Sequence, residues 1–135
     1  MKWNKQFIYP PSTRSLVMGQ RHYDISNEKL PSVTTILSQT QPEEKKRKLA
    51  EWQQKMGKDK ADSIRDQSAE RGTIMHRVLE GYITGERHVD LSEVGLKAGD
   101  MAKKIWVDDL KGNMDEVWGF EVTVYYRGLY AGAAD

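Results

Sequence analysis

Helical periodicity dominates the middle of the chain. One set of small and apolar positions recurs at spacings of four, four, three, four and four: Ile64, Ser68, Gly72, Met75, Leu79 and Ile83. Such spacing places them on one face of an α-helix. It predicts the longest and best-buried helix of the protein from about Lys60 to Thr84, ended by Gly85.

Two shorter helices are predicted before it. Ser32 is a suitable N-cap for a helix over Val33 to Ser38. The next helix is expected to start near Pro42, to carry Glu43 and Glu44 in its first turn, and to end at Gly57. Its apolar positions, spaced three and four apart, form one stripe of Leu49, Trp52 and Met56.

A fourth helix is predicted over Ser92 to Lys111, with Ser92 as its cap and Gly112 as its stop. The residues expected to point inward are Val94, Ala98, Met101, Ile105 and Trp106.

Strand patterns occupy the two ends of the chain. The first 30 residues alternate β-prone pieces (Gln6 to Tyr9, Ser15 to Met18, Arg21 to Ile25) with turn residues, which indicates a small hairpin or arm. Val117 to Tyr126 reads as a strand, Arg127-Gly128 as a turn, and Leu129 to Ala134 as the returning strand.

This order of elements predicts an α+β protein in a single domain. A β arm covers residues 1–30, a helical part residues 31–112, and a β-hairpin residues 117–135. A hairpin alone is a marginal sheet with an open edge, so we expect the sheet to be incomplete and the edge beside Leu129 to Asp135 to favour self-association.

Composition narrows the possible functions. The 135 residues are 38% apolar and 30% charged, which favours one folded domain. There is no Cys, so a disulfide framework, a thiolate zinc or iron–sulfur site and a cysteine nucleophile are excluded. No apolar run has the roughly 20 residues of a membrane span, and the first residues lack a signal-peptide pattern. We expect a cytoplasmic protein with no membrane partner.

Charge is distributed unevenly. Residues 1–71 hold 14 Lys and Arg against 9 Asp and Glu, whereas residues 72–135 hold 7 against 11. A positive half could follow a polyanion while an acidic half holds a metal ion, although chance produces such asymmetry too. Likewise Lys45, Lys46 and Lys48 near Trp52 could contact phosphates beside a stacked base, or form a solvated face while Trp52 fills a core.

Two windows could carry chemistry. On a helix, Gly72, His76 and Glu80 lie four apart and therefore share a face. Such a pair could also be only a hydrogen bond on a helix surface. The second window, Gly128 to Asp135, ends in a carboxylate after several small residues, and either a packing surface or a ligand fits it. Glu121, expected in the preceding strand, could be simply exposed.

Together these windows resemble a known family. The helix pattern Gly72-Thr73-x-x-His76-x-x-Leu79-Glu80, then Glu121, a hairpin and Tyr130-Ala131-Gly132-x-x-Asp135, is similar to the RecB-like branch of the PD-(D/E)XK nucleases, which includes phage exonucleases and the mitochondrial genome maintenance exonuclease. The stretch Leu30 to Leu37, preceded by Arg21 to Ile25, resembles the same proteins, as does the lysine-rich helix with Trp52.

The resemblance implies a metal-dependent DNA exonuclease, phage-encoded and acting on DNA that is single-stranded or has free ends. His76 and Asp135 would be ligands of Mg²⁺ or Mn²⁺, with Asp135 and Glu80 in catalytic roles and Gly72 and Glu121 supporting them. The DNA contacts would come from Lys45, Lys46, Lys48, Trp52, Arg71 and Thr73.

The family pattern continues with an Asp or Glu, one residue and a Lys on the next strand, and no such motif follows Asp135. We therefore expect this chain to be the N-terminal portion of a nuclease and to be catalytically inactive alone. One alternative is a module on a degenerate nuclease fold that binds nucleic acid or protein without cutting. Another is a helical interaction protein in which the His–Glu pair is fortuitous.

Overall fold

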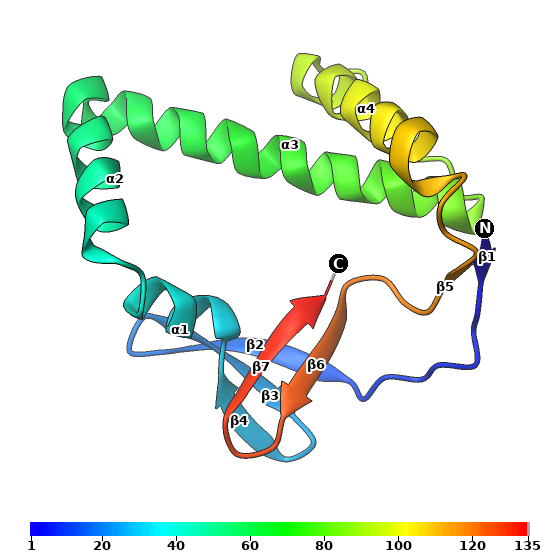
Figure 1. Cartoon of the computed structure of the whole chain (residues 1–135), viewed down its shortest axis with the longest axis horizontal. Coiled ribbons are helices and arrows are strands. Elements are labelled where there is room, and N and C mark those ends of the chain that lie inside the picture. Colours follow the sequence, from blue (N-terminus) through cyan, green and yellow to red (C-terminus); the bar gives the residue numbers. More distant parts are fainter. Residues whose placement is uncertain (135) are drawn as a thin grey trace. The chain divides into compact units, whose positions relative to one another are not determined.

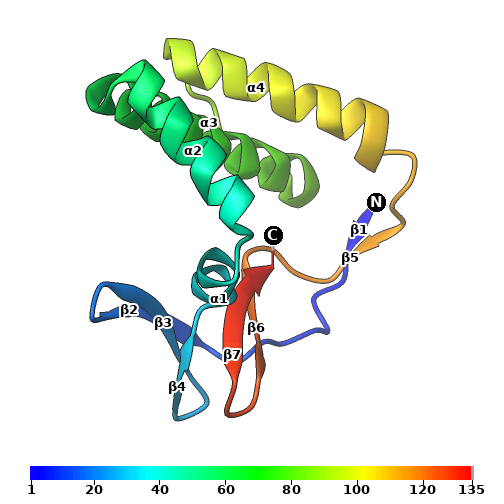
Figure 2. The same cartoon turned by 60° about the vertical axis from the view of Figure 1, so that its left-hand side comes forward.

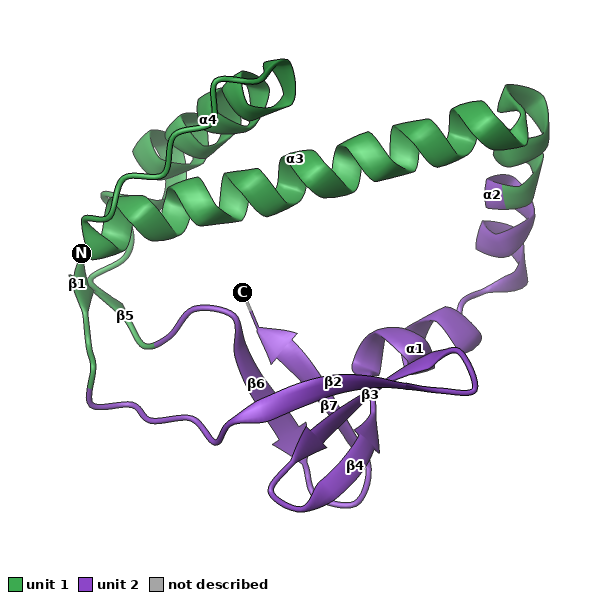
Figure 3. Cartoon of the chain, turned by 180° about the vertical axis from the view of Figure 1, so that it is seen from behind, with its two compact units in different colours: residues 1–5, 50–118 green, residues 6–49, 119–135 purple. Residues whose placement is uncertain are grey.

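The computed structural model describes residues 1–134, which form a mixed α+β structure with four α-helices and several small sheets (Figure 1). The α+β class is therefore confirmed. The contacts divide the chain into two compact units, each built from two distant segments (Figure 3). Unit 1 comprises residues 1–5 and 50–118, and unit 2 comprises residues 6–49 and 119–135. The single-domain expectation stays a prediction.

The longest helix of unit 1 is α3 (Lys58–Thr84), as predicted. Gly85 ends it in a left-handed conformation, with φ +83°, and donates its backbone N–H to the Gly81 carbonyl. The expectation that this helix is the best buried is wrong for the described residues. Only Ala61 and Ile74 are buried, and Ile64 is exposed, because α3 has a neighbouring helix within its own unit along only part of its surface.

The second helix of unit 1, α4 (Glu93–Ile105), begins at the predicted cap. The Ser92 side chain accepts a hydrogen bond from the Gly95 N–H, at 3.1 Å. The helix ends earlier than expected, because at Trp106 it passes into one π-helical segment, η1 (Trp106–Leu110).

Small residues bring α4 onto α3. The segment after Gly85 returns alongside α4, so that α4 runs in the same direction as α3 (Figures 1 and 3). Its buried residues are Gly95, Ala98 and Ala102, spaced three and four apart, and Ala98 is 0% exposed. The Tyr82 and Trp106 rings complete this contact at 5.4 Å between centroids. Met101 is exposed, so its expected inward position is wrong.

The two ends of unit 1 are joined by a short parallel pair, β1 (Lys2–Trp3) and β5 (Glu116–Val117). Glu116 strengthens it by accepting hydrogen bonds from the Asn4 side chain at 3.1 Å and from the Trp118 indole at 2.7 Å. The predicted single strand over Val117 to Tyr126 is therefore wrong. Its first part pairs with β1, and the chain leaves the strand conformation before Val122.

Helix α2 (Glu43–Met56) has the predicted bounds and the predicted acidic first turn. It has no buried residue, and Trp52 is 38% exposed. The alternative in which Trp52 fills a core is therefore not supported by the described structure.

Unit 2 begins with an antiparallel meander of β2 (Ser12–Val17), β3 (Gln20–Ile25) and β4 (Glu28–Pro31). Both turns have two residues with positive φ, Met18-Gly19 (+53° and +76°) and Ser26-Asn27 (+50° and +64°). Such turns match the twist of a hairpin, which explains the tight register. The predicted arm is confirmed as this meander, but Gln6 to Tyr9 forms no strand.

Unit 2 also contains α1 (Val33–Gln39) and the hairpin of β6 (Val122–Tyr126) and β7 (Tyr130–Ala134), which packs beside the meander (Figure 2). Ser32 caps α1 as predicted, accepting from the Thr34 N–H at 3.3 Å. The core consists of Tyr23, Ile25, Leu30 and Ala131, with Tyr125 against it.

Hydrogen bonds tie the hairpin to the meander at both of its ends. Ser12 and Thr123 share one at 2.6 Å near the start of β6. At the other end the Gly128 N–H donates to the Glu28 carboxylate at 2.8 Å. The outer edge of β7 forms one bridge, between Ala131 and Ser32, so this edge, predicted to be open, is partly covered.

Among the described residues, none of the helices combines the length and the apolar character that crossing a membrane requires.

Candidate functional site

The α3 window forms the geometry that its spacing predicts. Gly72, His76 and Glu80 lie within one unbroken helix, at successive turns of the same face. His76 is half-buried and Glu80 is exposed. A Cβ built on Gly72 would meet nothing within 4 Å, so the surface above this glycine is open. The helix therefore presents an imidazole and a carboxylate one turn apart beside an open position.

This pair does not by itself make a metal site. Within residues 1–134, no three His, Cys, Asp or Glu side chains form a group that could hold a metal ion. An imidazole nitrogen with carboxylate oxygens is a suitable donor set for Mn²⁺, and the oxygens for Mg²⁺. His76 thus fits the chemistry of the expected ion, but a complete set needs ligands from elsewhere. Asp135, the predicted second ligand, lies outside the described residues.

The remaining predicted carboxylate, Glu121, has a different local setting from the one expected. It precedes β6 rather than lying within a strand, its φ is +49°, and it belongs to unit 2. The strand prediction failed here because the chain must turn between its pairing with β1 and its pairing with β7.

The residues predicted to contact DNA lie on two helices. On α2, Lys46 pairs with Glu43 at 3.2 Å and Lys48 pairs with Glu44 at 2.8 Å, while Lys45 is exposed. A neighbouring carboxylate offsets much of a lysine's attraction for phosphate.

On α3, Arg71 is half-buried. The Thr73 hydroxyl donates to the Ala69 carbonyl at 3.0 Å, which leaves its oxygen lone pairs but not its proton for a ligand.

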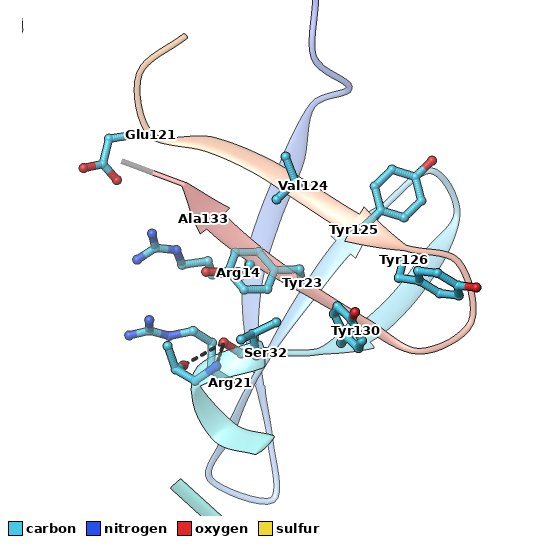
Figure 4. Close-up of a pocket in the computed structure, with 13 residues that line it drawn as sticks. Arg14, Arg21, Tyr23, Ser32, Glu121, Val124, Tyr125, Tyr126, Tyr130 and Ala133 are labelled. Carbon is cyan, nitrogen blue, oxygen red and sulfur yellow. Dashed lines mark hydrogen bonds between the residues drawn. The ribbon is translucent and has the colours of Figure 1, made fainter. Parts of the chain in front are cut away.

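Unit 2 contains a hollow of about 600 Å³ that the sequence did not predict (Figure 4). Two cationic side chains line it, Arg14 from β2 and Arg21 from β3. Four aromatic rings also line it: Tyr23, Tyr125, Tyr126 and Tyr130. The only carboxylate in its described lining is that of Glu121, so two guanidinium groups face one acid.

Strand register explains why these arginines meet. In the β2–β3 hairpin, Arg14 pairs with Tyr23 and Leu16 pairs with Arg21. Directly opposed residues share a face, and residues two apart on one strand share it as well. Arg14, Arg21 and Tyr23 therefore project from the same face, and the Arg14 guanidinium lies 5.8 Å from the centre of the Tyr23 ring.

A signal for this cluster was present in the sequence. A two-residue turn at Met18-Gly19 fixes the register of its flanking strands, and that register alone puts Arg14 and Arg21 on one face. The sequence could not have shown that Tyr126 and Tyr130 lie near these arginines, because the meander and the hairpin are far apart in the chain and meet only through tertiary contacts.

No family model, no curated protein and no solved structure matches this chain.

Proposed function

We propose that this chain is part of a metal-dependent DNA exonuclease of the RecB-like PD-(D/E)XK type. The observation that carries the proposal is the unbroken α3 face of Gly72, His76 and Glu80, followed in the chain by a hairpin whose returning strand is Tyr130–Ala134. The resemblance requires the first motif to lie on a helix and the last motif to lie on a returning strand. Glu121, which the resemblance expects in a strand, instead precedes β6.

In the proposed site, His76 would offer a nitrogen and Asp135 a carboxylate to the ion, and Glu80 would orient its neighbour from the next turn. A bound Mg²⁺ or Mn²⁺ would polarise the scissile phosphodiester and lower the pKa of a water molecule. The role of α3 is to hold His76 at a fixed position through the rigid backbone of a long helix. The open position at Gly72 leaves room for a substrate to approach the helix.

Calorimetry with Mn²⁺ tests the site in residues 1–135. We expect His76→Ala and Asp135→Ala each to weaken binding by tenfold or more, because each removes a direct ligand. His88→Ala is the matched control, since His88 is an exposed histidine with no predicted role. Equal binding by all of these variants and the wild type would remove the metal-site proposal.

A second candidate is a module that binds nucleic acid without cutting it. The hollow of unit 2 favours this function, because its described lining offers arginine and tyrosine side chains but only one carboxylate and no histidine. A nuclease assay with Mn²⁺ on linear DNA separates the two candidates. It should use residues 1–135 and the full-length gene product. Cleavage of the DNA by the full-length product, abolished by His76→Ala, supports the enzyme, whereas binding without cleavage supports the module.

A further inference from the structure

The hollow of unit 2 has two chemically different ends. In Figure 4 the Arg14 and Arg21 side chains extend in the same direction, on the side where Glu121 lies, whereas Tyr126 and Tyr130 lie toward the turn of the hairpin. Both ends belong to the lining of the same hollow.

The tyrosine end is accessible to a ligand. Tyr126 is 60% exposed and Tyr130 is 40% exposed, although both rings are large and largely apolar. They are directly paired across the strands, and their ring centroids are 5.9 Å apart at an angle of 31°. Two neighbouring exposed rings on a fixed hairpin form a platform onto which a flat aromatic group can stack.

The arginine end is positively charged. Among residues 1–134, no ion pair joins Arg14 or Arg21 to a carboxylate. The Arg14 guanidinium lies 5.8 Å from the centre of the Tyr23 ring, and the Arg21 backbone carbonyl accepts the buried Ser32 N–H at 3.0 Å. Planar guanidinium groups are suited to phosphate oxygens.

We propose that this hollow binds a single strand of nucleic acid, with Arg14 and Arg21 on its phosphates and Tyr126 and Tyr130 under its bases. A strand supplies negative charge and flat rings along one chain, which matches the two ends. A duplex keeps its bases stacked on one another and so cannot offer them to the tyrosines. The inference extends the proposed function by assigning a strand-binding site, but it requires no cleavage.

The test is fluorescence anisotropy with a labelled 15-residue oligo(dT) in EDTA, where no metal contributes. We expect Tyr126→Ser with Tyr130→Ser to weaken binding about fivefold or more, and the corresponding Phe variants to retain it, because stacking needs the ring and not the hydroxyl. We expect Arg14→Gln and Arg21→Gln each to weaken binding and to reduce the slope of log K against log salt by about 0.7. Arg87→Gln, which removes an exposed arginine of unit 1, is the charge-matched control.

An abasic oligonucleotide of the same length separates the two ends. Its affinity should depend on the arginines but not on the tyrosines. The proposal is overturned if the Arg14, Arg21 and Arg87 variants bind alike, if the Ser variants bind oligo(dT) as the wild type does, or if poly-glutamate of equal charge competes as well as oligo(dT). Circular dichroism of each variant confirms folding. Because the assay contains no metal, failure of the metal site at His76 leaves its result unchanged.

Discussion

At the scale of single residues, Asp90 shows how one carboxylate fixes the start of a helix. Its Oδ1 accepts hydrogen bonds from the Ser92 hydroxyl at 2.6 Å and from the Ser92 N–H at 2.9 Å. The same hydroxyl oxygen accepts from the Gly95 N–H. The hydrogen bond from the Ser92 side chain, followed by that from its backbone, lowers the pKa of Asp90 below its ordinary value.

This lowered pKa predicts a pH dependence of stability. A carboxyl group with a depressed pKa in the folded state stabilises the protein above its unfolded pKa, about 3.9, and loses this contribution as the pH falls through the folded value. Asp90→Asn should therefore lower the urea midpoint at pH 6, and its difference from wild type should shrink as the pH approaches 3. A difference that stays constant over this range would contradict the prediction. In Ser92→Ala, NMR titration should show the Asp90 pKa nearer its ordinary value.

At the scale of elements, two glycines of α4 provide a matched pair. A Cβ on Gly95 would collide with the side chain and the carbonyl oxygen of Asp90, whereas a Cβ on Gly99 would meet nothing within 4 Å. Gly95→Ala should destabilise the protein by about 1–3 kcal/mol, because buried backbone must move. Gly99→Ala should stabilise it by about 0.5–1 kcal/mol through helix propensity. Urea unfolding measures both, and equal effects would show that α4 does not start as described.

At the scale of the whole molecule, the positive charge of residues 1–71 predicts a contribution to DNA binding beyond any single site. Replacing Lys45, Lys46 and Lys48 by Gln should weaken oligonucleotide binding and lower its salt dependence, because fewer counterions are released. The effect should be modest, since Lys46 and Lys48 already pair with acids on α2. Replacing Lys103, Lys104 and Lys111 by Gln is the control. If both triple variants bind equally, the α2 lysines are only a solvated face.

What the sequence by itself determined is local. The caps Ser32 and Ser92 and the stop at Gly85 were predicted correctly, and the hairpin turn was predicted one residue too short, since it comprises residues 127–129. Each depends on hydrogen bonds or backbone angles within a few residues, so the deciding atoms are neighbours in the chain. The same locality explains the correct α+β class and the correct bounds of α2. It would also have sufficed to place Arg14 and Arg21 on one face.

What only the tertiary structure decided depends on partners far away in the chain. The segment Val117 to Tyr126 has uniform strand propensity, yet it is divided because Glu116 pairs with Lys2 while Val122 pairs with Ala134. Which helix faces are buried also depends on partners far away in the chain. A long apolar stripe did not make α3 the best-buried helix, whereas Gly95, Ala98 and Ala102 packed fully because small side chains let α4 approach α3 closely. The hollow with its arginine and tyrosine ends likewise exists only because contacts such as that between Ser12 and Thr123 join segments 111 residues apart.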